Sequence, residues 1–339
     1  MTQHHLDEAI RYIHYQEGII TGLQNELKAL TINHQDAVEL LNTRTAELHA
    51  AQTFLSKTDT VSDSEIRQAI ERLNAEIHQI AAAVSDSIPY SSDKGQNVSL
   101  SQRTLDNLAA ILGKPLFERL KAVAADDEAI VQIALQARIS RFASNYLQSF
   151  GNFDENNKAL RSVWQSIRGA ETQSVSGRWR ALARQHAKKV PEFNNPSPVK
   201  LRKALAARII EVVKSTGIQE DLNGLSWQLQ ERFGSKLDAI VQLILSIQKT
   251  ILEDVIAYDF HPIIAYPGHP FDGTLMEDEF EDRSEGSKDK AGPALCAVAL
   301  GLTRNEMVME DGQPVERRTI VLKTKVAMEC VLKEFEQSE

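Results

Sequence analysis

A heptad repeat runs through the first 55 residues and constrains the fold of this chain more than any other feature of its sequence. Counting by seven from Leu6 gives a large aliphatic residue at every position except one: Leu6, Ile13, Ile20, Leu27, His34, Leu41, Leu48 and Leu55. The positions three residues later are mixed: Ala9, Gln16, Leu23, Leu30, Ala37, Arg44 and Ala51. An apolar repeat of this spacing, uninterrupted by proline over about seven heptads, predicts a coiled-coil helix.

A second amphipathic helix is predicted after the polar break at residues 56–64. Ser62 and Glu65 have the spacing of a capping box, in which each residue satisfies a backbone group of the other. Apolar residues then alternate at intervals of four and three until Pro89: Ile66, Ile70, Leu73, Ile77, Ile80 and Val84. Residues 1–88 are therefore predicted to be coiled-coil helices that fold back as an antiparallel hairpin.

The first predicted helix is about twice as long as the second, so the hairpin leaves the front of its apolar seam uncovered. The uncovered seam residues are Leu6, Ile13, Ile20, Leu23, Leu27 and Leu30. A stripe of this length rarely stays exposed, so we expect it to be buried by a second copy of the chain or by another coiled-coil protein. The alternative is that it packs on the chain's own helical domain. The flanking charges do not distinguish parallel from antiparallel pairing.

After the hairpin, the sequence predicts a mainly all-α protein. Residues 89–99 read as a polar linker, and helical patterns of unequal length then recur through residues 100–258, as in an irregular helical bundle. The last helix of this region, from about Ser235 to Ala257, is apolar on most sides and is expected at the centre of the bundle.

The C-terminal end has a different character. Residues 259–292 are rich in Pro and Gly and then acidic, which favours a flexible segment. Residues 293–339 carry two β-prone runs around an Asp311-Gly312 turn signal. A small mixed element with a β-hairpin is therefore expected there.

Charge, cysteine content and hydropathy limit the classes of function. The 339-residue chain has a net charge of −9, so a positive field over the whole chain is absent. Its two cysteines, Cys296 and Cys330, exclude a disulfide framework and have no zinc-ligand spacing. The N-terminus has no signal-peptide pattern, and the most apolar stretch is too short and too charged to span a bilayer. We therefore expect a cytoplasmic or nuclear protein with no transmembrane segment.

The sequence contains no catalytic, phosphate-binding or dinucleotide-binding motif. The best metal-ligand group is His261, His269 and Asp272, but its spacing matches no established ligand motif, and a proline follows each histidine. We therefore predict no catalytic residue, no metal site and no cofactor. An enzyme remains an alternative reading, because an active site built on helices needs no recognisable motif.

One segment, residues 178–208, is strongly basic, and we call it the basic segment. Its acidic residue is Glu192, and the candidate binding residues are Arg178, Arg180, Arg184, Lys188, Lys189, Lys200, Arg202 and Lys203, with Arg208 at the end of the segment. Two basic helices joined by a loop could present one positive face to nucleic acid or to an anionic surface. The alternatives are that this face is simply solvated, that it pairs with the chain's acidic residues near 277–285, or that it is a nuclear-import signal.

Three strings resemble a group of uncharacterised coiled-coil and helical proteins from mushroom-forming fungi. They are LNAEIHQIAAAVSDS from Leu73, LCAVALGL from Leu295 and VLKTKVAMECVL from Val321. The resemblance implies the same plan, in which an N-terminal coiled coil precedes a long helical region. It implies no activity and no functional residues.

Taken alone, the sequence favours a non-enzymatic interaction or scaffold protein that assembles through the N-terminal coiled coil. The alternative function is the binding of nucleic acid or an anionic surface through the basic segment. The sequence names no partner, substrate or pathway for either function.

Overall fold

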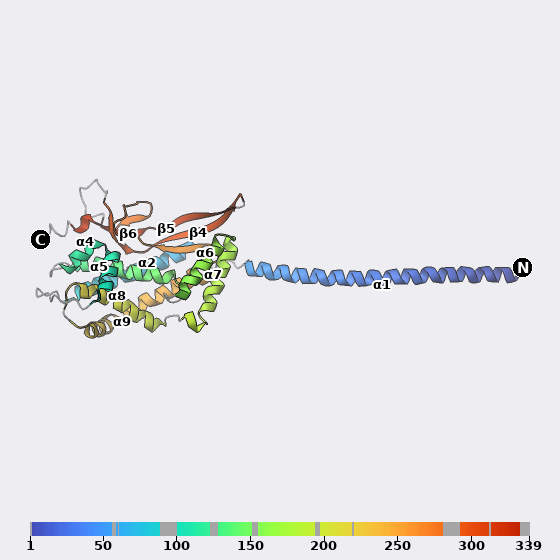
Figure 1. The fold of residues 1–339 in the computed structure, drawn as a ribbon, viewed down its shortest axis with the longest axis horizontal. Helices are drawn as coiled ribbons and strands as arrows, with labels where there is room; N and C mark the ends of the chain where they lie inside the picture. Colours follow the sequence, from blue (N-terminus) through green and yellow to red (C-terminus); the bar gives the residue numbers. More distant parts are fainter. Residues whose placement is uncertain are drawn as a thin grey trace. The chain divides into compact units, whose positions relative to one another are not determined.

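The computed structural model divides the chain into two compact units, Met1–Lys57 and Thr58–Glu339. It describes residues 2–55, 59, 61–88, 100–122, 128–150, 155–193, 197–218, 220–280, 292–311 and 313–332. The described residues are mainly helical, as the sequence predicts, and the strands lie in the C-terminal part of the chain (Figure 1).

The first unit contains one helix, α1 (Thr2–Leu55), which is the long blue helix of Figure 1. Its 54 residues include no proline, and at about 1.5 Å per residue they make a helix of about 80 Å. Gly18 and Gly22 lie within it, and each costs about 1 kcal/mol of helix stability relative to Ala. α1 is therefore one continuous helix across all the predicted heptads.

The second predicted helix, α2 (Asp63–Asp86), begins with the predicted capping box at Ser62. The Ser62 hydroxyl accepts from the Glu65 N–H at 3.3 Å, and the Ser62 N–H donates to the Glu65 carboxylate at 2.7 Å. All six residues of its predicted apolar stripe are buried, and α2 packs against α5 (Glu128–Leu147) and α9 (Leu222–Lys249). The structure therefore places α2 in the second unit, and the predicted domain boundary at residue 88 falls inside that unit.

The remaining helices complete an irregular helical bundle. They are α3 (Gln102–Leu112), α4 (Lys114–Lys121), α6 (Glu155–Arg168), α7 (Gln173–Ala187), η1 (Pro191–Phe193), α8 (Pro198–Ser215) and η2 (Thr250–Asp254). In α5, 15 of 20 residues are buried, whereas 7 of 28 are buried in α9. The most buried helix is therefore α5. The helix that was predicted from about Ser235 to Ala257 and expected at the centre keeps an exposed side at Gln242, Ser246 and Lys249. By contrast, α5 has neighbours on all sides, namely α2, α3, α4, α8, α9 and β3.

The strands form two three-stranded sheets. They are β1 (Asp259–Ile263), β2 (Met276–Asp278), β3 (Ala294–Ala299), β4 (Gly301–Glu310), β5 (Gln313–Leu322) and β6 (Thr324–Met328). One sheet has the order β1-β4-β5 and the other has the order β2-β6-β3. β1 and β2 lie in the segment that was predicted to be flexible, because their pairing with β4 and β6 is non-local and leaves little local signal. The acidic residues 281–291 of that segment lie outside the described residues.

The predicted hairpin is larger than expected, because β3 and β4 are joined at Leu300 and β5 and β6 at Lys323. The four strands thus form one long antiparallel ribbon that changes sheet at these two points. Gly301 stands at the change, where an added Cβ would lie 2.5 Å from the backbone nitrogen of Thr324. The Asn74 side chain of α2 fixes the same point: it donates to the Leu300 carbonyl and accepts from the Leu300 N–H, both at 2.9 Å. This contact attaches the ribbon to the helical bundle.

Candidate functional site

The first candidate site is the seam of α1, which we define as the six predicted residues Leu6, Ile13, Ile20, Leu23, Leu27 and Leu30. Their side chains are between 51% and 71% exposed. The heptad continues with Leu41 and Leu48, which are 65% and 59% exposed. α1 thus carries an aliphatic stripe along its length, with nothing packed on it within its own unit.

Three polar residues interrupt the stripe at Gln16, His34 and Arg44. Arg44 donates to the Glu47 carboxylate one turn later, at 2.7 Å, and both side chains are exposed. Exposed pairs of this kind contribute about 0–1 kcal/mol, so this contact does not fix Arg44 in one position. The polar residues therefore interrupt the aliphatic stripe at three positions, and these positions restrict the register in which a second helix can pair with α1.

The second candidate site, the basic segment, is divided between the interior and the surface. Arg180, on α7, is 1% exposed and pairs with Asp259, which is also buried. Burial lowers the pKa of Arg180 to about 10, so the guanidinium stays charged at neutral pH. Arg184, one turn later, is buried as well and donates to the Phe150 carbonyl and to Gln248 at 2.8 Å. These two arginines have no free guanidinium to offer a phosphate.

The other residues of the segment lie nearer the surface. Lys188 pairs with Glu253, and Arg202 pairs with Asp238 at 3.0 Å. Arg178 is half-buried, and the exposed lysines of the segment are Lys188, Lys189, Lys200 and Lys203. The acids that pair with this segment therefore lie on β1, η2, α9 and α8, where Glu211 pairs with Arg208. Of the predicted acidic partners near 277–285, Glu279 pairs instead with Lys325 at 2.7 Å, and residues 281–285 lie outside the described residues.

Asp259 is the centre of a buried polar network that the sequence did not indicate. Its other carboxylate oxygen accepts from Arg168 of α6 at 2.7 Å, and its side chain is 1% exposed. Arg168 also reaches Glu316 of β5 at 2.6 Å, and this contact lowers the pKa of the Glu316 carboxyl. The network joins α6, α7, β1 and β5. In the sequence this network appears as an Asp at the start of a strand, and that pattern is too common to identify a buried network.

The weak metal-ligand group is split up by the fold. The His261 ring lies 5.9 Å from Trp164, between centroids, and burial with Arg168 and Arg180 lowers the pKa of His261 to about 3. His269 instead contacts Tyr266, with the ring centroids 5.7 Å apart and the rings tilted by 38°, and the Asp272 carboxylate accepts from Thr274. Within the described ranges, no three His, Cys, Asp or Glu side chains are grouped so that they could hold a metal ion.

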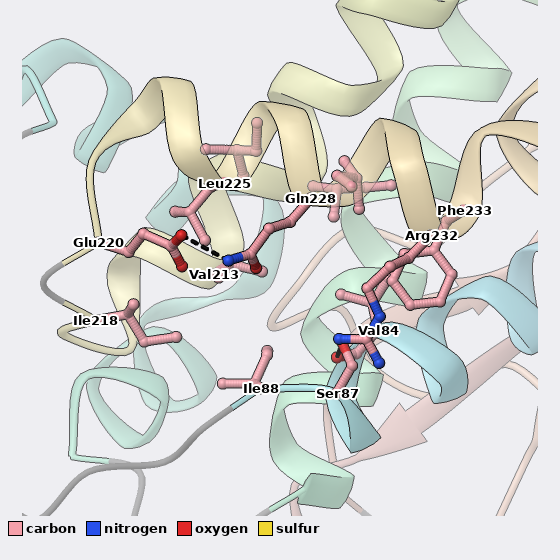
Figure 2. A pocket seen from close by; sticks show the side chains of 13 residues that line it. Val84, Ser87, Ile88, Val213, Ile218, Glu220, Leu225, Gln228, Arg232 and Phe233 are labelled. Atoms are coloured by element: carbon pink, nitrogen blue, oxygen red, sulfur yellow. Dashed lines mark hydrogen bonds between the residues drawn. The ribbon is translucent and has the colours of Figure 1, made fainter.

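A small apolar cavity lies between α2, α8 and α9 (Figure 2). Figure 2 shows Ile88 and Ile218 on one side and Phe233 on the other, while Gln228 donates to Glu220 at 2.6 Å at the rim. The cavity volume, about 40 Å³, is a few times the ~10–15 Å³ that one water needs. This space suits a few waters or one inserted side chain. The hydroxyl in its lining, that of Ser87, donates to the Val84 carbonyl at 2.9 Å.

Cys296 is not placed for redox or nucleophilic chemistry. Cys296 lies in β3 and is fully buried, and burial raises the pKa of its thiol to about 12. A thiol that is protonated and inaccessible is a poor nucleophile. Cys330 is exposed near the C-terminal end of the described chain.

Comparisons with protein-family models, with curated proteins and with solved structures found no match. In the part of the chain that the structure describes, no helix is long and apolar enough to cross a membrane. Among the surfaces described above, α1 carries the long aliphatic stripe that is left exposed.

Proposed function

We propose that this protein is a non-enzymatic interaction or scaffold protein that assembles through the seam of α1. The observation that carries the proposal is the exposure of all six seam residues, each above 50%, on one continuous helix of 54 residues. A helix of a globular protein obtains most of its stability from packing of its apolar face, and α1 has no such packing in its unit. Another helix laid along the seam would provide it.

The gain from covering the seam is large. Full burial of one Leu or Ile side chain contributes about 1.5–3 kcal/mol relative to exposure. Leu27 and Leu30 are 68% and 71% exposed, so burial by a partner would contribute most of this free energy for each of them. Several such layers are enough to offset the entropy of association, which is the requirement for a stable assembly.

The obvious partner within the chain is already engaged. The stripe of α2 that would complete the predicted hairpin is buried against α5 and α9, with Ile70, Leu73 and Ile77 fully inaccessible. Exchanging these contacts for contacts with α1 would open the core of the second unit. This cost favours a partner from another chain over an intramolecular hairpin.

The alternative function, nucleic-acid or anionic-surface binding by the basic segment, has less support. Two of its arginines, Arg180 and Arg184, bind buried groups of the protein's interior. Two more of its cations, Lys188 and Arg202, form ion pairs with acidic side chains. A retained heparin complex that weakens steeply with salt would revive this alternative, because counterion release requires several free cations.

The test of assembly is the molar mass of the full chain in solution, measured by light scattering during size-exclusion chromatography. We expect a mass of at least twice 37.8 kDa for the wild type. The double variant Ile13→Asp, Ile20→Asp should return to 37.8 kDa, because it places two charges in the seam.

The matched control is Ile32→Asp. Ile32 is 53% exposed, as Ile13 is, but it lies on the face of α1 opposite the seam. This variant should keep the mass of the wild type. A wild type that stays at 37.8 kDa at high concentration would contradict self-assembly.

A further inference from the structure

We infer that the seam of α1 binds a second copy of α1, antiparallel and in full overlap. The inference rests on the assembly proposed above and specifies its partner and geometry. It is carried by the order of large, small and polar residues along the heptad, which is complementary to its own reverse.

In a parallel, in-register pair, each seam residue faces the same residue of the other copy. Ala37 would face Ala37 and leave space in the core, since neither side chain fills the layer. Arg44 would face Arg44, which places two positive charges in one layer. Gln16 and His34 would also face themselves, so no aliphatic residue would cover any of the polar layers.

An antiparallel pair removes each of these conflicts. We place a twofold axis between Lys28 and Ala29, at the middle of α1. The facing residues are then Leu6 with Ala51, Ile13 with Arg44, Gln16 with Leu41, Ile20 with Ala37, Leu23 with His34 and Leu27 with Leu30. Every layer now contains a large aliphatic side chain, and each small or polar residue faces one. This alternation of large and small is how facing helices fill their core.

The residues beside the seam support the same register. Ile19 and Leu40 flank the seam on one side and are 41% and 58% exposed. In the antiparallel arrangement Ile19 of one copy lies next to Leu40 of the other, so the two cover each other. In a parallel pair Ile19 would lie next to Gln24 and Leu40 next to Thr45, both polar.

The position of the axis also agrees with the bounds of the helix. Thr2 and Leu55, the ends of α1, are equidistant from it, so no turn is left without a partner. The seam and its two flanking positions then include 32 residues of each copy, slightly more than the ~20–30 per side of a stable interface. Self-complementarity in full overlap is the reason for naming a second copy as the partner.

The test measures distances between spin labels by pulsed electron resonance in the full chain. Cys330→Ser removes the exposed thiol, and Cys296 is buried. A label is then placed through Arg11→Cys or, separately, through Asn25→Cys, both on the face of α1 away from the seam. Arg11 would lie level with residue 46 of the second copy, so the labels at this site should be about 50 Å apart at ~1.5 Å per residue. Asn25 would lie level with residue 32, and its labels should be roughly 25 Å apart or less.

The outcomes are distinct. A dimer mass with a long distance at residue 11 and a short one at residue 25 supports the inference. A dimer mass with short distances at both sites means a parallel pair, which overturns this inference and leaves the proposed assembly intact. A monomer mass overturns both.

Discussion

At the scale of single residues, Asp259 shows how burial decides the role of a charge. Both of its carboxylate oxygens are used, one by Arg180 and the other by Arg168, and neither charge of the Arg180–Asp259 pair reaches water. A buried pair of this kind contributes modestly while intact, but removal of one partner leaves the other charge uncompensated.

We therefore expect Asp259→Ala to lower the free energy of unfolding by about 3–5 kcal/mol. The control is Asp238→Ala, which breaks the more exposed pair with Arg202 and should cost about 0–1 kcal/mol. Urea denaturation followed by circular dichroism measures both. Equal, small losses would mean that the network around Asp259 is not a structural requirement.

His261 lies beside the same network and gives it a dependence on pH. Burial is the largest cause of the lowered pKa of His261, about 3. Nearby positive charges also oppose its protonation, those of Arg168, Arg180 and Arg161, whereas Glu316 favours it. In the unfolded chain a histidine titrates near pH 6.5. The folded protein therefore binds fewer protons than the unfolded one between these values, so this contribution is complete above pH 6.5 and is lost as the pH falls toward 3.

We expect His261→Gln to reduce the slope of unfolding free energy against pH between about pH 6 and pH 4. The slope from one such proton is at most about 1.4 kcal/mol per pH unit. Carboxyl groups also titrate in this range, so the measurement is the difference between variant and wild type in urea denaturation at each pH. An identical slope for the two proteins would contradict the burial of the neutral ring.

At the scale of elements, the sequence predicted the positions of the helices better than it predicted which elements they pack against. The periodicity of α1 and α2 and the capping box at Ser62 are local signals, and each helix begins near its predicted position. The packing of α2 depends on residues far away in the sequence. Its apolar stripe of period 3.5 alone would suit a bundle core as well as a coiled coil. The basic segment was misleading for the same reason: nothing local distinguishes the buried Arg180 from the exposed Lys189.

The packing of α7 on the end of η2 depends on one glycine. A Cβ at Gly177 would lie 2.2 Å from the Ile256 carbonyl oxygen, so the backbone would have to move. We expect Gly177→Ala to destabilise the protein by about 1–3 kcal/mol through overpacking.

Gly234 in α9 is the matched position, because a Cβ there meets no atom within 4 Å. Gly234→Ala should stabilise the protein by about 0.5–1 kcal/mol, since alanine favours the helix and restricts the unfolded chain. Thermal unfolding should therefore shift in opposite directions for the two substitutions. A shift in the same direction would mean that the contact with Ile256 does not limit α7.

At the scale of the whole molecule, the two units differ in how their apolar residues are packed. The core of the second unit is complete without α1, because α2 packs within it and Asp59 accepts from the backbone N–H groups of Ile256 and Ala257 at 2.6 and 2.9 Å. The first unit contributes the heptad and no core of its own. Under the proposed assembly, folding of the core and pairing between copies would therefore depend on different parts of the chain.

We expect a chain that begins at Thr58 to fold and to remain monomeric. Its unfolding midpoint in urea should match the transition of the full chain, and its mass by light scattering should be that of one copy. A truncated chain that fails to fold would show that the second unit needs α1, while a truncated chain that still assembles would place the interface outside the seam of α1.

The contact between Asn74 and Leu300 has a consequence for synthesis. The two residues are 226 positions apart, so α2 leaves the ribosome well before the strand that it must anchor. At ~5–20 residues per second the delay is roughly 10–45 s, during which the apolar face of α2 lacks its complete surroundings. α1 needs only contacts within the first 55 residues. Under the proposed assembly, α1 of two neighbouring nascent chains could therefore pair before either second unit can fold.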